Sequence, residues 1–340
     1  MALHFSWRLP HQAQAPTPAL PDWQAQPGGW IQLAQAVEYA GLDGVWIDSG
    51  PGLPDSLGVA AALSAHTERI GVTVSIAAEV MLPAALAGTV QSLQSISGQR
   101  VRLHLCDRDR HVSGVTLNRD QRSERLEEYL ELLSRLLSPD GDPVNHTGRY
   151  FQLENAGIVR RGGLAAPLLL NDHLGPATVG RYADQCLLGV GPLQPMAARI
   201  ERHRAAAGVH QRPLSFACGL GLMLGDSDDE AWQCALDHLD ALGIAPASDI
   251  AGVRDLPDPW AALKRLAIHP NLWQPTADAP VFLVGGAQRI AERLALLHEL
   301  GIRHVVFESR RPVADVLRFG ERVVPLLVDR GLYQENTPRG

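Results

Sequence analysis

The chain has 340 residues, 46% of them hydrophobic, so it can bury the core of one large α/β barrel or of two domains. Its formal net charge of −7 argues against a surface for nucleic acid or anionic membranes. No segment approaches the roughly 18 apolar residues of a membrane span, and the N-terminus lacks the apolar core of a signal peptide. The four cysteines show no CxxC spacing, which favours reduced thiols in a cytoplasmic protein.

Short apolar runs alternate with amphipathic stretches through the first 137 residues. The apolar runs predict strands over 4–9, 45–48, 70–76 and 101–106. The stretches between and after them predict helices over 30–39, 56–66, 83–96 and 120–137. Each strand is therefore followed by a helix.

The alternation continues after a first interruption at 138–164, which we interpret as an insertion with a hairpin-like centre. Strands are predicted over 167–170, 186–190 and 214–224, and helices over 177–183 and 196–206. Ser227, with Glu230 three residues later, predicts the capped start of a further helix. A second, Pro-rich insertion follows at 244–280.

The last part of the chain repeats the pattern most clearly. A helix is predicted over 289–300, ended by Gly301, and a strand over 302–307 follows it. The short apolar run 281–284 could be a ninth strand, but we interpret it as the lead-in to that helix. Eight alternating units favour a (β/α)8 TIM barrel in a single domain over 1–330, with a tail at 331–340. No GxGxxG follows the first strand, which disfavours a dinucleotide-binding fold.

The working face of such a barrel is formed by the carboxyl ends of the strands and the loops after them. This rule selects the following residues: His11, Asp48, Ser75, Ile76, Ala77, His104, Cys106, Asn171, His173 and Arg310. His104 could also be a core histidine, and Asp48 a loop cap. Arg310 could hold an anionic phosphate or an acidic substrate. The run from His104 to His111 contains metal-ligand residue types, but its spacing favours a solvated loop, and we expect no metal.

Several longer stretches resemble the luciferase-like flavin-dependent monooxygenases, with the alkanesulfonate monooxygenase branch as the most similar. These stretches are WRLPH at 7–11, AQAVEYAGLDGVWI at 34–47, NHTGRYFQL at 145–153, DSDDEAWQ at 226–233, HPNLW at 269–273 and the segment 281–327. The similarity extends over essentially the whole chain.

The resemblance implies a barrel enzyme that binds reduced flavin mononucleotide (FMN) from a separate flavin reductase and reacts with O2 and a small substrate. It places the flavin phosphate beside Asn171, His173 and Gly175, and the flavin ring over Asp48, Ser75–Ala77 and His104. It further implies that His146 and Tyr150 contact the flavin. His11, His104 and Arg310 remain as catalytic candidates. Members of the family commonly form dimers or tetramers.

The sequence departs from the sulfonate-oxidising branch at several polar positions. Leu53 stands in place of a cysteine, Gly219 and Gly221 in place of an Arg-x-His, and Arg310 and Pro312 in place of a Tyr-x-His. Two alternatives therefore stay open: a non-catalytic binding protein with the same barrel, or an oxidoreductase that uses a deazaflavin. The substrate could still be similar to an alkanesulfonate.

Overall fold

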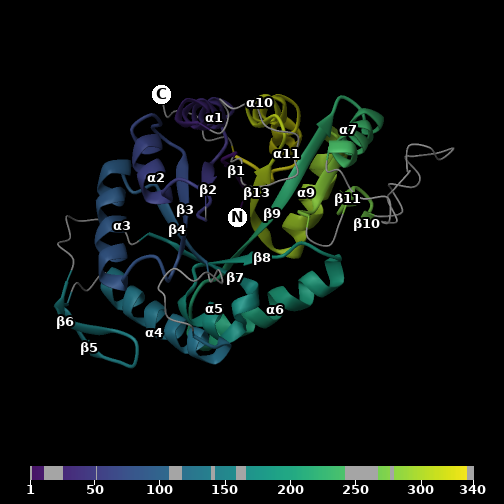
Figure 1. The fold of residues 1–340 in the computed structure, drawn as a ribbon. Helices are drawn as coiled ribbons and strands as arrows, with labels where there is room; N and C mark the ends of the chain where they lie inside the picture. Colours follow the sequence, from purple (N-terminus) through teal and green to yellow (C-terminus); the bar gives the residue numbers. More distant parts are fainter. Residues whose placement is uncertain are drawn as a thin grey trace. The chain divides into compact units, whose positions relative to one another are not determined.

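A computed structural model describes residues 2–10, 26–50, 52–106, 117–138, 142–157, 166–241, 267–275 and 279–334. Parallel strands alternate with helices along these ranges, and the fold is a (β/α)8 barrel, as the sequence predicts. Among the helices in these ranges, none is both long and apolar enough to cross a bilayer. The chain divides into two compact units. Figure 1 labels their helices and strands.

Unit 1 comprises residues 1–45, 188–201 and 215–340. Its strands are β1 (His4–Arg8), β9 (Ser215–Gly225), β10 (Ala267–His269), β11 (Leu272–Trp273), β12 (Phe282–Gly286) and β13 (Ile302–Glu308). Its helices are α1 (Pro27–Tyr39), α7 (Asp228–Ala241), α9 (Ala287–Leu300), α10 (Pro312–Arg322) and α11 (Val324–Asp329). Helix α6 (Leu193–Val209) begins in this unit.

Unit 2 comprises residues 46–187 and 202–214. Its strands are β3 (Gly71–Ala77), β4 (Val101–Cys106), β5 (Val144–Thr147), β6 (Gln152–Ala156), β7 (Leu168–Asn171) and β8 (Gln185–Leu188), together with the end of β2 (Gly44–Ile47). Its helices are α2 (Ser56–Ser64), α3 (Pro83–Ser97), α4 (Arg119–Leu137) and α5 (Pro176–Tyr182), with the short 3-10 helix η2 (Asp172–Leu174).

The two faces of the unit 1 sheet differ in chemistry. Phe5 and Phe307 point to one face, where both rings pack against Phe319 of α10 at centroid distances of 5.1 and 5.2 Å. Because side chains alternate along a strand, Ser6 and His304 point to the opposite face, which we call the inner face. His304 Nε2 lies 2.8 Å from Ser6 Oγ, and both residues are buried. The inner face is therefore partly polar.

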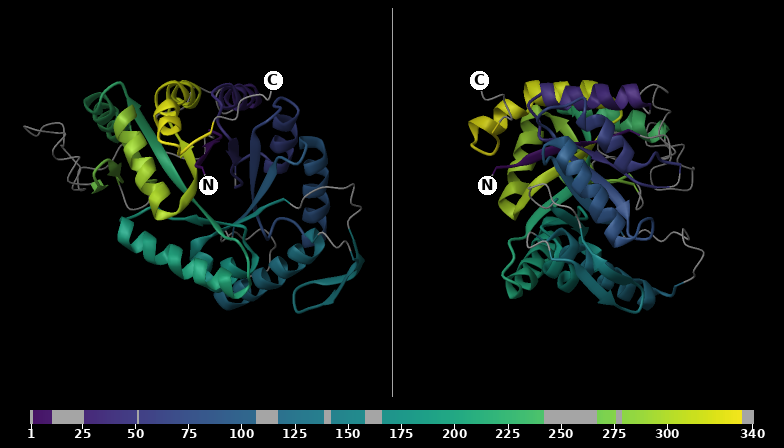
Figure 2. Two further views of the ribbon diagram at one scale, coloured as in Figure 1. Left: turned by 180° about the vertical axis from the view of Figure 1, so that it is seen from behind. Right: turned by 90° about the vertical axis from the view of Figure 1, so that its left-hand side faces the viewer.

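Strand β9 is long enough to pair with two neighbouring strands. Phe216–Gly221 pair in parallel with β13, and Gly221–Gly225 pair in parallel with β12. β12 occupies the run that we interpreted as a helix lead-in, so that interpretation is wrong. Part of the second predicted insertion is also regular, since β10 and β11 continue from β12 as antiparallel strands. Figures 1 and 2 show β9 as the long green strand that ends beside α7.

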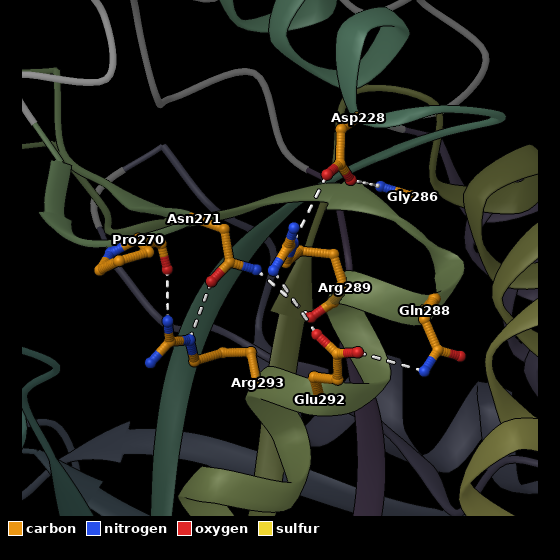
Figure 3. A network of polar contacts seen from close by, with 8 residues as sticks. All are labelled: Asp228, Pro270, Asn271, Gly286, Gln288, Arg289, Glu292 and Arg293. Atoms are coloured by element: carbon orange, nitrogen blue, oxygen red, sulfur yellow. Dashed lines mark hydrogen bonds and ion pairs between the residues drawn. The ribbon is translucent and has the colours of Figure 1, made fainter.

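The ends of two helices are joined by the network in Figure 3. Asp228 Oδ1 accepts a hydrogen bond of 2.8 Å from the Gly286 N–H, at the start of α9, while its Oδ2 lies 3.4 Å from Arg289 Nε. Arg293 Nε donates to Asn271 Oδ1 at 2.8 Å, and Asn271 Nδ2 donates to the Arg289 carbonyl at 3.4 Å. These bonds attach the β10–β11 turn and α7 to α9 and so fix the extension around β12.

The predicted helix boundaries are confirmed at two positions where the sequence carries a cap. Ser227 Oγ accepts from the Glu230 N–H at 3.2 Å, while the Glu230 carboxylate accepts from the Asp226 N–H at 2.6 Å. Gly301 ends α9 with a φ of 111°, a left-handed conformation that glycine adopts without steric cost. Two further helices, α10 and α11, follow β13.

Candidate functional site

A group of buried side chains gathers at the carboxyl ends of β3, β4 and β7 in unit 2. The parallel register sets Ser75 beside His104, and the ring nitrogen Nδ1 lies 2.9 Å from Ser75 Oγ. The other ring nitrogen, Nε2, lies 3.3 Å from Asn171 Oδ1 at the end of β7. His104 and Ser75 are buried, and Asn171 is half-buried. The side chains of these three neighbouring strands therefore form one hydrogen-bonded network.

The hydrogen-bonding roles of the His104 ring nitrogens follow from their partners. The Asn171 side-chain oxygen only accepts, so His104 Nε2 donates to it. The Ser75 hydroxyl can donate or accept, so it satisfies Nδ1 in either protonation state of the ring. Because each of its nitrogens is engaged, the ring plane is held in one orientation.

The end of β2 adds an aromatic wall and a carboxylate to this group. The Trp46 ring lies 4.8 Å from the His104 ring, centroid to centroid, at an interplanar angle of 49°. The Trp46 indole N–H donates to Asp48 Oδ1 at 3.2 Å, and Asp48 is buried. We call Trp46, Asp48, Ser75, His104 and Asn171 the histidine cluster. The sequence reasoning did not select Trp46, although it precedes Asp48 by two residues and alternation places both side chains on one face.

The other predicted residues of β3 divide between its two faces. Ala77 pairs with Cys106 and shares the face of Ser75, whereas Ile76 pairs with Leu105 and points to the opposite face. A ligand above the histidine cluster could therefore meet the side chain of Ala77 but only the backbone of Ile76. Cys106 Sγ lies 3.9 Å from Ser49 Oγ, and no cysteine among the described residues forms a disulfide.

The loop after β7 contains the residues that are predicted to contact the flavin phosphate. His173 is exposed on η2, and Gly175 has a φ of 89°, which an L-amino acid rarely adopts. Apart from its chain neighbours, no described residue places a heavy atom within 4 Å of the position where a Cβ on Gly175 would be. There is thus open space beside Gly175, close in sequence to Asn171.

The predicted flavin contacts His146 and Tyr150 lie in a different place, on the β5–β6 hairpin. His146 Nε2 lies 3.0 Å from Glu128 Oε1 of α4, and the Tyr150 hydroxyl donates to Glu124 Oε2 at 2.9 Å. Figures 1 and 2 show the hairpin at the edge of unit 2, beside α4. The structure does not bring this pair together with the histidine cluster, so their contact with a cofactor stays a prediction.

Glu128 is the anchor of this hairpin. Its carboxylate accepts from the backbone N–H groups of Tyr150 and Phe151, at 3.1 and 2.9 Å. Burial would raise the pKa of Glu128, but the hydrogen bonds from His146 and the two N–H groups outweigh it and lower the pKa. A Cβ on Gly148 would stand 1.9 Å from Glu128 Oε1, so the hairpin turn closes around the carboxylate only because residue 148 is glycine.

The remaining predicted catalytic residues lie elsewhere. His11 is outside the described residues, as are Asp107, Asp109 and His111 of the run after β4. Arg310 follows β13 in unit 1 and is half-buried. Burial and the nearby charge of Arg310 together lower the pKa of His238 in α7 to about 4.

The positions that depart from the sulfonate-oxidising branch have identifiable packing roles. A Cβ on Gly221 would stand 2.2 Å from the ring of Phe282, so this ring fills the place of a side chain there. Pro312 is the first residue of α10, where the missing N–H has no cost. Gly219 lies under the guanidinium of Arg8, whose Nη2 is 3.8 Å from the ideal Cβ position.

The sequence of residues 3–304 matches the family model described as luciferase-like monooxygenase. The chain belongs to this family. Solved structures with the same fold include riboflavin lyase with a modified FMN and riboflavin, at a TM-score of 0.78 and 18% identity over 99% of this chain and 94% of that chain. EDTA monooxygenase from Chelativorans sp. BNC1 has a TM-score of 0.77 and 17% identity over 98% and 96% of the two chains.

A third similar structure uses another cofactor. It is the coenzyme F420-dependent tetrahydromethanopterin reductase from Methanopyrus kandleri, at a TM-score of 0.71 and 16% identity over 96% of this chain and 99% of that one. At these identities the likeness shows the fold alone. The family match supports an oxidoreductase, while the cofactor depends on the residues of the site.

Proposed function

We propose that the protein is a flavin-dependent monooxygenase that oxygenates a small organic substrate with O2. In this proposal reduced FMN is the cofactor, and a separate reductase delivers it. The main observation in support of this proposal is the histidine cluster. In it, His104 lies between Ser75 and Asn171 at the carboxyl ends of adjacent parallel strands. In a (β/α)8 barrel this end of the strands is where ligands and reactants bind.

The residues of the cluster fit a flavin by their chemistry. The flavin ring is planar, largely apolar on its faces and rich in hydrogen-bonding atoms on its edge. The Trp46 ring offers an aromatic surface beside His104, while Asn171 offers amide groups at the border of the cluster. Reduced FMN, when bound, would supply the two electrons that the reaction with O2 consumes.

The protein's own groups would orient the ring and exclude water. His104 and Ser75 are buried, and the hydrogen bond between them fixes their orientation before a ligand binds. A preorganised site loses less entropy on binding than one that must be ordered by its ligand. Asn171 would hold the ring edge, and the open space beside Gly175 would accept the phosphate.

Anaerobic titration with reduced FMN tests this proposal. We expect saturable binding to the wild-type protein and at least about 30-fold weaker binding to His104→Gln, which corresponds to about 2 kcal/mol for the lost contacts. His66→Gln is the matched control, because His66 is exposed at the end of α2. A second titration with reduced F420 discriminates the deazaflavin alternative. Wild-type protein that binds neither cofactor would contradict the proposal and favour a non-catalytic role.

A turnover assay separates an oxygenase from an oxidase or a binding protein. The protein is supplied with reduced FMN by a flavin reductase under 18O2, in the presence of candidate substrates. Incorporation of one 18O atom into product supports the proposal. Flavin oxidation with no labelled product, for every substrate that binds, would contradict the monooxygenase assignment.

A further inference from the structure

The loop between β7 and α5 is bonded to a buried histidine of α6. His203 is 3% exposed, and its Nε2 lies 3.3 Å from the backbone carbonyl oxygen of Asp172, the first residue of η2. A carbonyl oxygen only accepts, so the imidazole Nε2 donates this hydrogen bond. The same oxygen accepts from the Gly175 N–H at 3.1 Å, which closes the turn. One carbonyl group thus joins His203 to the loop.

A close contact between two helices fixes the position of His203 relative to this loop. A Cβ on Gly180 of α5 would stand 2.7 Å from backbone atoms of Ala206 and Ala207 in α6, so the two helices touch through their backbones. Ala206 follows His203 by three residues, which places both on one face of α6. All these residues belong to unit 2, and Figure 1 shows α5 and α6 side by side. The donor is therefore held at a constant distance from the loop.

The far end of the loop has no side chain. Gly175 has a φ of 89° and a ψ of 155°, a conformation that is essentially restricted to glycine, and open space lies beside it. Backbone at a glycine can approach a ligand closely. Backbone N–H groups cannot rotate toward an anion as a side chain can, so they bind it well only if the loop is already in position. A group that fixes the loop therefore affects the binding of a phosphate.

We propose that His203 is a positioning residue that makes the site selective for a phosphorylated flavin. Its hydrogen bond holds the Asp172 carbonyl, and with it the loop as far as Gly175, where the phosphate would lie. His203 acts through the loop and does not touch the ligand. The inference rests on the proposed function, because the phosphate is that of FMN. It adds the residue that makes FMN preferred to riboflavin, which has the same ring and no phosphate.

Paired anaerobic titrations of the full chain with reduced FMN and reduced riboflavin test this role. Both flavins carry the ring that would meet the histidine cluster, whereas only FMN carries the phosphate. The quantity to be measured is the selectivity, which is the dissociation constant of riboflavin divided by that of FMN. We expect the wild-type protein to bind FMN at least about 10-fold more tightly than riboflavin, because hydrogen bonds to a charged group are strong.

Variants of His203 separate the hydrogen-bond donor from the ring. His203→Phe keeps a ring but has no donor, so the selectivity should fall about 3- to 10-fold while the riboflavin affinity stays unchanged. His203→Gln places an amide N–H near the position of Nε2 and should restore most of the selectivity. His210→Gln is the matched control, because His210 is exposed just after the end of α6. Its selectivity should equal that of the wild type.

A change in the loop gives an independent reference. Gly175→Ala is strained in the conformation of the loop, so it should lower the selectivity at least as much as His203→Phe. If His203→Phe does not fold, His203→Asn replaces it, because the shorter amide does not reach the Asp172 carbonyl. Circular dichroism shows whether each variant is folded, and its riboflavin affinity shows whether the histidine cluster is intact.

Three outcomes would overturn this inference while the proposed function stands. In the first, the wild-type protein binds both flavins equally well. In the second, Gly175→Ala lowers the selectivity and His203→Phe does not. In the third, His203→Phe weakens both flavins by the same factor, as a purely structural role predicts. Wild-type protein that binds neither flavin would instead contradict the proposed function, on which the inference depends.

Discussion

The histidine cluster of unit 2 and the Arg8–Glu308 pair of unit 1 both lie at the ends of parallel strands, yet they differ in charge and exposure. His104 makes hydrogen bonds with both ring nitrogens and is buried. Arg8 and Glu308 form a loose charged pair whose side chains are about a fifth to a quarter exposed. A buried hydrogen-bonded network holds a ring in one orientation. A partly exposed ion pair is screened by solvent and holds its two side chains less firmly.

The largest expected effect concerns acid stability in unit 1. Burial, with the charge of Arg310, lowers the pKa of His238 to about 4 in the folded protein, while the unfolded value is about 6.5. The unfolded chain therefore binds the proton first, and stability falls as the pH drops below about 6.5 until the loss is complete near pH 4. The maximum loss is about 3 kcal/mol.

His238→Phe should remove this pH dependence, because a phenyl ring fits among aromatic neighbours and does not titrate. Urea unfolding at pH 7 and pH 4.5 measures the difference for wild type and variant. Equal acid sensitivity of both proteins would show that another group controls it. His66→Gln serves as the control, since His66 is exposed.

The next effect, at about 2 kcal/mol, concerns the histidine cluster. His104→Gln should weaken reduced-flavin binding, while Arg8→Gln, in unit 1, should leave it near the wild-type value. Anaerobic titration measures the affinity of both variants. Equal weakening by both variants would show that the loss at His104 is not specific to the histidine cluster.

A smaller effect on stability is expected when either Gly148 or Gly219 is replaced by alanine. Gly148→Ala would drive a Cβ to within 1.9 Å of Glu128 Oε1 and should cost about 1–3 kcal/mol of unfolding free energy. Gly219→Ala meets its nearest atom at 3.8 Å and should change stability by less than about 1 kcal/mol. Thermal unfolding measures both. The ranking would be contradicted if Gly219→Ala were the more damaging change.

The smallest effect is expected for exposed ion pairs between α7 and α10. Arg322 Nη1 lies 2.6 Å from Asp226 Oδ1, but both side chains are about half exposed. Solvent and salt screen such a pair, so Arg322→Gln should cost at most about 1 kcal/mol. The cost should vanish in about 1 M salt. A larger, salt-independent loss would show that this contact contributes through packing.

Local sequence patterns were sufficient for most of the barrel. The strand predicted over 101–106 has the bounds of β4, and Gly301 ends α9 as expected. β12 was missed because its identity depends on a partner far along the chain. The second half of β9 extends past β13 and needs a strand beside it, which no periodicity within 281–284 could reveal.

The candidate site was predictable to the extent that it follows strand order. The rule of carboxyl strand ends selected Ser75, His104 and Asn171, and the parallel register brings them into hydrogen-bond distance. The sequence could not show that His238 of α7 lies against Phe282, since this contact depends on how the chain folds back over β12. The resemblance alone suggested His146 as a flavin contact; the structure shows its contact with Glu128, and the flavin contact stays a prediction.

The double pairing of β9 also affects how this chain can diversify. Residues between Gly225 and Gly286 leave the strand at one end and return beside it through β12. A segment so placed can be lengthened, shortened or exchanged during evolution while Phe216–Gly221 keep their pairing with β13. New ligand preferences could thus arise by replacing one continuous stretch of gene, with the catalytic scaffold inherited intact.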